Sequence, residues 1–164
     1  MDIVKPRLPL SPISHMTKNF TDCLAILNAH HSLATDHDWE NWLRAVEQLP
    51  PAQSEIDIAS LYALLSDDID IQDGMWTLLH KIEDNEPTML MHGFVRAVAA
   101  MQNAAPIWAK TCAMRILNND SDCQILRAAI NDLPPHAVQP ICELITRIAE
   151  TEPDFAASAA LVLS

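Results

Sequence analysis

The chain has 164 residues, of which 49% are hydrophobic and 20% are charged, a composition typical of one globular domain rather than a disordered segment. Its formal net charge of -12 argues against binding to nucleic acid or to an anionic membrane surface, because both attract basic proteins. The same charge allows a cationic protein partner.

The first 16 residues, MDIVKPRLPLSPISHM, contain three prolines and lack the apolar h-region of a secretory signal. We expect residues 1–16 to form a flexible leader and residues 17–164 to form the single folded domain. No run of residues in the chain is apolar over the length that spans a membrane.

From residue 17 onward, apolar residues recur with a helical period, as Leu90, Phe94 and Val98 do. Strand-like alternation is confined to the short, acidic run DIDIQD. The sequence therefore predicts an all-α domain of about nine short helices. These are expected at residues 18–33, 38–48, 54–65, 74–84, 87–103, 106–118, 121–132, 135–149 and 153–163.

The short connections favour antiparallel helix neighbours. Helix pairs that begin near residues 74, 106 and 135 are about 30 residues apart, close to the period of an α-solenoid. We therefore expect a HEAT-like stack, with a compact irregular bundle as the alternative.

Helix ends are indicated by prolines, which favour the first turn, and by capping residues. The expected first-turn prolines are Pro87, Pro106 and Pro153. The expected caps are Asp73 before the helix at 74–84, Asp120 or Ser121 before the helix at 121–132, and Asn118 or Asn119 as a left-handed C-cap.

Four cysteines, Cys23, Cys112, Cys123 and Cys142, are too far apart for a C-x-x-C zinc motif. Each falls in an apolar helical pattern, where a thiol behaves as a small hydrophobic group. Reduced core cysteines favour a cytoplasmic protein.

The segment SDDIDIQDGMW resembles a calcium loop and can be tested against the EF-hand pattern. A loop that starts at Asp68 places Asp73 where glycine is required and Leu79 where glutamate is required. The register that puts Gly74 at the glycine position begins on an isoleucine. The spacing therefore excludes an EF-hand.

Two interpretations of this acidic segment stay open. In one, it is a solvated loop that ends with Asp73 as a helix cap. In the other, Asp67, Asp68 and Asp70 face outward and form an acidic surface that binds a protein.

The segment AHHSLATDHDWENW gathers histidines and carboxylates between His30 and Asp38, which could serve metal binding or acid–base chemistry. No H-E-x-x-H motif is present. The run also crosses a predicted helix end, where histidine interacts with the helix dipole and Asp36 or Asp38 can cap the next helix. No metal or cofactor is therefore expected, and no nucleophile motif or phosphate loop is present.

Trp39, Trp42, Trp76 and Trp108 lie in helical patterns, and we expect them in or beside the core rather than as interface anchors. His80 and Glu83 share a helix face and could hydrogen-bond. Arg115 lies off the apolar stripe of its helix, so we expect an ion pair between Arg115 and Glu83.

In one stretch of the chain an acidic loop is followed by the segment DGMWTLLHKIED and then by the segment APIWAKTCAMRILNND. This stretch resembles the immunity protein 30 family of bacterial polymorphic toxin systems. The resemblance covers roughly residues 65–120. It rests on Trp76, Leu79, His80, Glu83, Trp108 and the run Arg115-Ile116-Leu117-Asn118.

The resemblance implies a non-enzymatic inhibitor that binds the toxin domain of a contact-dependent or secreted effector. Many such toxins are nucleases with basic active sites, so we expect a cationic partner. The residues expected to contact it are Asp67, Asp68, Asp70, Asp73, Glu83, Asp84, Asn119, Asp120 and Asp122. The alternatives are a HEAT-like adaptor with no toxin partner and a small metal-dependent enzyme that uses the His30–Asp38 cluster.

Overall fold

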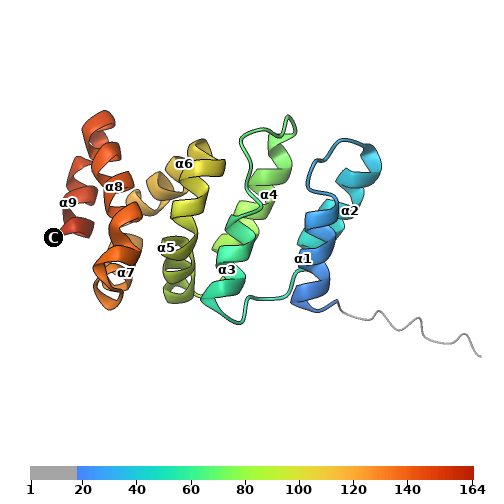
Figure 1. Ribbon diagram of the computed structural model, residues 1–164, viewed down its shortest axis with the longest axis horizontal. Helices are drawn as coiled ribbons and strands as arrows, with labels where there is room; N and C mark the ends of the chain where they lie inside the picture. Colours follow the sequence, from blue (N-terminus) through green and yellow to red (C-terminus); the bar gives the residue numbers. More distant parts are fainter. Residues whose placement is uncertain (1–17) are drawn as a thin grey trace, which may run out of the picture.

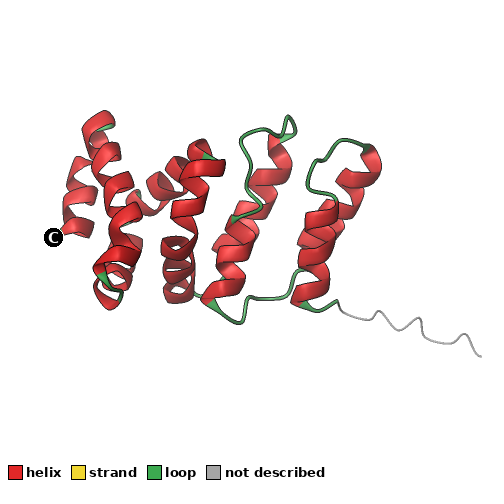
Figure 2. Cartoon of the chain, viewed as in Figure 1, coloured by secondary structure: helices red, strands yellow, loops and turns green. Residues whose placement is uncertain are grey.

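The structure of the protein is a computed structural model, and it describes residues 18–164 (Figure 1). This part of the chain is helical and contains no β-strand (Figure 2), which confirms the all-α prediction. The predicted leader at 1–16 lies outside the described residues. The helices are α1 (Phe20–Ala29), α2 (Asp36–Gln48), α3 (Glu55–Tyr62), α4 (Gln72–Glu83), α5 (Pro87–Ala104), α6 (Pro106–Leu117), α7 (Asp120–Asp132), α8 (Pro135–Thr151), the 3-10 turn η1 (Pro153–Phe155) and α9 (Ala156–Leu163).

The helices follow one another in a row, from α1 and α2 at one end of the molecule to α9 at the other (Figure 1). In this row α3 packs on α5, α5 on α7 and α7 on α9, while α2 packs on α4 and α6 packs on α8. The odd-numbered helices from α3 to α9 thus pack on one another in sequence, and α5 also packs on α8. The more specific comparison with HEAT repeats stays a prediction.

The core is one continuous cluster of apolar side chains along this row. Its largest fully buried members are Trp42, Tyr62 and Phe94. The rings of Tyr62 and Phe94 join α3 to α5 with their centroids 5.2 Å apart. Burial of such aromatic side chains supplies a large part of the folding free energy.

The contact between α3 and α5 is unusually close because residue 93 is glycine. A Cβ atom on Gly93 would lie 2.3 Å from Ile58 Cγ2 and 2.4 Å from Ile58 Cβ. The missing side chain lets the two backbones approach each other. This contact fixes Tyr62 of α3 relative to Leu90 and Met91 of α5.

Several helix ends agree with the sequence analysis, and others do not. Pro87, Pro106 and Pro153 occupy first turns as predicted. Asp73 is not a cap, because α4 begins at Gln72, and the residue before it, Ile71, forms no side-chain cap. Asp73 instead lies in the first turn, where its charge still favours the helix dipole.

The turn between α6 and α7 also differs from the prediction. Asn119 caps α7, and its side-chain oxygen accepts hydrogen bonds from the N–H groups of Ser121 and Asp122 at 2.9 and 3.2 Å. Asp120 and Ser121 therefore lie inside the helix. Asn118 has a right-handed backbone with φ -76°, so the predicted left-handed C-cap is wrong.

All four cysteines are free thiols. Cys23, Cys112 and Cys123 are buried, as expected for core cysteines, whereas Cys142 is half-buried.

Candidate partner-binding site

The His30–Asp38 segment is organised by local hydrogen bonds. His30 Nδ1 and a carboxylate oxygen of Asp38 are 2.8 Å apart, and the backbone N–H of Thr35 donates to the same carboxylate at 3.1 Å. Hydrogen bonds from His30 and Thr35 lower the pKa of Asp38. His31 Nε2 lies 2.6 Å from the carbonyl oxygen of Leu64, which ties this segment to the end of α3.

Within residues 18–164, no three His, Cys, Asp or Glu side chains are grouped so that they could hold a metal ion. The side chains of Thr35 and Asp38 form a capping box at the start of α2. The geometry therefore favours a structural role for the His30–Asp38 segment.

The acidic segment between α3 and α4 is anchored to α6 by Asp67. The Asp67 carboxylate accepts hydrogen bonds from the N–H groups of Ile107 and Trp108 at 2.9 and 3.2 Å. It supplies the cap that Ala105, the residue before α6, cannot provide. The expectation that Asp67 is free to face outward is therefore wrong, whereas Asp68 and Asp70 are exposed.

Beside this segment, two tryptophans join α4 to α6. Trp76 and Trp108 meet edge to face, with ring centroids 4.9 Å apart. Trp108 is buried and its Nε1–H donates to the carbonyl oxygen of Ser66 at 3.1 Å. Trp42 is also buried and Trp39 is half-buried, so the prediction of core or near-core positions holds for three of the four tryptophans. Trp76 is the exception.

Trp76 is 37% exposed, and Ile107 next to it is 68% exposed. The two side chains line a cavity of about 190 Å³ together with Asp67 and Trp108. We call this surface, defined by Trp76, Ile107 and the exposed Asp68 and Asp70, the α4–α6 face. Its exposed tryptophan belongs to a residue type that is enriched at protein interfaces, and its carboxylates could form the polar rim of such an interface.

Toward the C-terminal ends of α4 and α6, the predicted pair of Glu83 and Arg115 is present. Arg115 Nε and Nη2 donate to the two carboxylate oxygens of Glu83 at 2.5 and 2.7 Å. The guanidinium carbon also lies 5.7 Å from the centroid of the Trp76 ring, within reach of a cation–π interaction. The hydrogen bond with Glu83 raises the pKa of Arg115. His80, which we considered as a partner of Glu83, packs against Trp76 instead.

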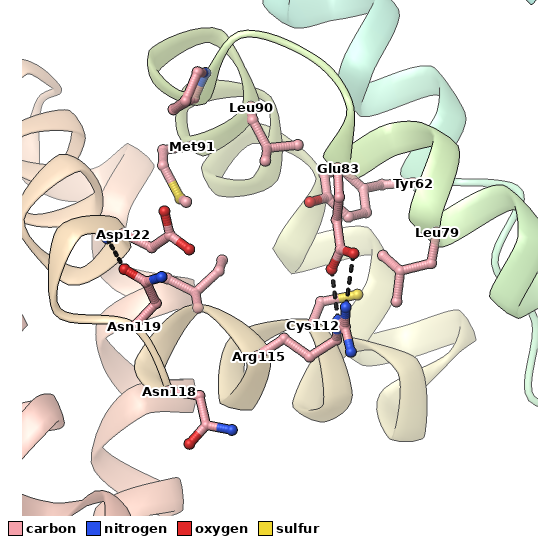
Figure 3. A pocket seen from close by; sticks show the side chains of 12 residues that line it. Tyr62, Leu79, Glu83, Leu90, Met91, Cys112, Arg115, Asn118, Asn119 and Asp122 are labelled. Carbon is pink, nitrogen blue, oxygen red and sulfur yellow. Dashed lines mark hydrogen bonds and ion pairs between the residues drawn. The ribbon is translucent and has the colours of Figure 1, made fainter.

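The Glu83–Arg115 pair forms part of the wall of a cavity of about 450 Å³ (Figure 3). Helices α3 to α7 all contribute side chains to it. The lining residues are Tyr62, Leu79, Glu83, Pro87, Leu90, Met91, Cys112, Arg115, Ile116, Asn118, Asn119 and Asp122.

Burial and charge shift the titration of three groups at this cavity. Burial raises the pKa of Tyr62 well above its ordinary value and raises that of Cys112 to about 12. The pKa of Asp122 is also raised, first by burial and then by the negative charge of Glu83. Burial withholds water from the ionised form of each group, so the neutral form is favoured.

The predicted contact residues thus fall into two groups instead of one patch. Those from Asp67 to Asp73 lie near the N-terminal ends of α4 and α6. Those at Glu83, Asp84 and residues 119–122 lie near the C-terminal ends, about 15 Å or more away, since a helix rises 1.5 Å per residue. Trp76 and Arg115 lie between the two groups.

Sequence reasoning missed Tyr62, Met91 and Cys112, which complete the cavity. Each belongs to the apolar stripe of its own helix, so the local pattern marks it only as a core residue. The exposure of Trp76 was also missed. One signal could have found it. Trp76 lies seven residues, or two helical turns, before Glu83, so both side chains share the face of α4 that is turned toward Arg115.

These observations define a helical protein whose α4–α6 face has the composition of a protein-binding surface. The family model described as Immunity protein 30 matches residues 29–126, which is well over half of the chain. The chain therefore belongs to the immunity protein 30 family, as the resemblance indicated, and is an immunity protein.

No curated protein and no solved structure matches the chain. In residues 18–164, none of the helices has the length and apolar character needed to cross a membrane.

Proposed function

We propose that the protein binds a cognate toxin domain and neutralises it, and that the α4–α6 face makes the contact. Trp76 carries this proposal, because it is a large aromatic side chain left exposed between two acidic regions. Tryptophan is enriched among the residues that dominate binding energy at interfaces. Membership in the immunity protein 30 family supports a toxin as the partner.

The charge of the chain supports a basic toxin domain, such as a nuclease. With a net charge of -12, the protein attracts a cationic partner over long range and accelerates association. Asp68 and Asp70 are exposed in the segment that joins α3 to α4 and are suited to this role. An acidic protein also competes with nucleic acid phosphates for a basic active site.

We infer that the protein acts by occupying the toxin and catalyses no reaction. Family membership supports this, and the histidine segment that could have served chemistry is used in the capping of α2. A toxin that acts inside bacteria would be met in the cytoplasm, so we place the protein there.

The test is co-expression with the toxin domain encoded immediately upstream, with survival and affinity as readouts. We expect Trp76→Ala to weaken binding by about 30-fold or more, the usual size of a tryptophan hot spot. Ile56→Ala is the matched control, because Ile56 is 64% exposed but belongs to α3 and not to the α4–α6 face. Equal effects of the two substitutions would contradict the assignment of the α4–α6 face.

A second arm of the experiment tests the charges. Substitution of Asp68 and Asp70 by lysine should lower the association rate and its dependence on salt. Asp67 is left unchanged, because its loss would uncap α6. A wild-type protein that neither binds the toxin nor protects cells would favour the adaptor alternative.

A further inference from the structure

We propose that the cavity lined by Tyr62, Glu83 and Asp122 is a socket for one basic side chain of the partner, an arginine or a lysine. This proposal rests on the proposed function, because the partner that supplies the basic side chain is the toxin domain. It adds the chemical group that enters the cavity and the side chains that receive it.

The free charge in the cavity belongs to Asp122. Glu83 and Arg115 satisfy each other through two hydrogen bonds, so their charges cancel. Within the described residues, the Asp122 carboxylate has no hydrogen-bond or ion-pair partner, although it is half-buried at the cavity (Figure 3). Asp38, at the equivalent third position of α2, instead turns back to the N–H of its cap residue.

Tyr62 provides a second, independent polar group. Its side chain is only 2% exposed, and its hydroxyl group forms no hydrogen bond within residues 18–164. No side-chain nitrogen or oxygen that is sealed from solvent in this part of the chain lacks a partner. The hydroxyl group must therefore reach the cavity, where it can accept a hydrogen bond from a guest.

The remaining walls suit the aliphatic stem of a basic side chain. Leu79, Leu90 and Met91 line the cavity with apolar surface. Lysine and arginine bury their methylene stems on such surfaces while the charged end reaches a polar group. A volume of about 450 Å³ lies in the range of pockets that bind small groups.

Other guests fit less well. An anion would meet Glu83 and Asp122, and the N–H groups of Ser121 and Asp122 that could bind it are already occupied by Asn119. A purely apolar guest would bury the Asp122 carboxylate without a partner. A guanidinium or ammonium group satisfies Asp122 and restores a neutral cavity.

The experiment uses small mimics of the guest and the full chain. Propylguanidinium and butylammonium are titrated into protein with labelled methionine and isoleucine methyl groups, and the shifts of the Met91 and Ile116 methyl signals are followed by NMR. We expect saturable shifts at these residues and none at the exposed Ile56. Butanol, which has the stem without the charge, should bind at least about tenfold more weakly.

Two variants test the receiving groups. Asp122→Asn should weaken binding of both mimics by about tenfold or more, and Tyr62→Phe by a smaller factor. Asp36→Asn is the matched control, because Asp36 is an exposed carboxylate in the first turn of α2. Shifts that fail to saturate, or that survive Asp122→Asn unchanged, would overturn the socket.

The same variants are then compared for binding of the upstream toxin domain. If wild-type protein binds the toxin and Asp122→Asn does so equally well, the socket is wrong and the proposed function stands. If the mimics bind as expected and wild-type protein does not bind the toxin, the proposed function fails while the cavity keeps its assigned chemistry.

Discussion

Gly93→Ala tests whether the close contact of α3 and α5 shapes the molecule. The added Cβ atom would lie 2.3 and 2.4 Å from Ile58 Cγ2 and Cβ, and 3.1 Å from the carbonyl oxygen of Glu55. A rotamer change cannot move a Cβ atom, so the two helices must separate. Overpacking of this kind costs about 1–3 kcal/mol or more, and the better helix propensity of alanine offsets about 1 kcal/mol.

Because Ile58 Cβ cannot move aside by a rotamer change, we expect a cost near the upper end of this range, about 3 kcal/mol, and therefore a net loss of about 2 kcal/mol in the free energy of unfolding. With a typical urea dependence of about 2 kcal/mol per molar, the unfolding midpoint should fall by about 1 M while the slope stays unchanged. Circular dichroism at 222 nm follows the unfolding. The separation of the helices should also shift the NMR signal of the Met91 methyl group at the cavity.

Gly74→Ala is the matched control. Its nearest obstacle is Leu33 Cδ1 at 2.6 Å, the end of a side chain that can rotate away. We expect this variant to lose about 1 kcal/mol or less. A Gly93→Ala protein that is as stable as the wild type would refute the account of the α3–α5 contact.

Three further predictions concern Asp67, Asp122 and the cysteines. Asp67→Ala should lose about 1 kcal/mol of stability in urea unfolding because α6 loses its cap, whereas Asp68→Ala should lose almost none. Asp122→Asn should stabilise the free protein at neutral pH. Burial and the charge of Glu83 raise the pKa of Asp122 in the folded protein, so the stability of the wild type falls as the pH rises through that pKa. The advantage of the variant should vanish in pH-dependent unfolding below the unfolded-state pKa of about 3.9. In native protein treated with iodoacetamide and analysed by mass spectrometry, half-buried Cys142 should react first and Cys112 last, because burial raises the pKa of Cys112 to about 12.

The helices were predictable from the sequence because their signals are local. Apolar periodicity and first-turn prolines place α5 and α6 within a residue or two of their observed bounds. The pairing of Glu83 with Arg115 was predictable for a similar reason. Both residues lie off the apolar stripes of neighbouring helices of similar length, so they meet at the same level of the stack.

Cap identity and exposure could not be predicted in the same way. Asp67 caps a helix whose first residue lies about 40 positions later in the chain, and no sequence spacing indicates such a contact. The cavity combines Tyr62 of α3 with Met91 of α5 and Asp122 of α7, so it exists only once the helices are packed. Trp76 and Trp108 have similar helical surroundings in sequence, yet only the packed structure exposes Trp76 and buries Trp108.

The negative charges of this protein do not all serve one purpose. Asp38 and Asp67 use their carboxylates to satisfy N–H groups at helix starts, so they stabilise the fold. Asp122 is partly desolvated and has no hydrogen-bond or ion-pair partner within residues 18–164, and Trp76 is 37% exposed. A free protein would be more stable with a fully solvated or paired carboxylate at position 122 and a polar side chain at position 76. Residues that lower stability in this way concentrate at functional sites. Because Arg115 lines the cavity with Asp122 and lies over the ring of Trp76, one partner could cover both. We therefore propose that the partner-binding surface is better sought at the groups that the fold leaves unsatisfied than at the densest acidic segment.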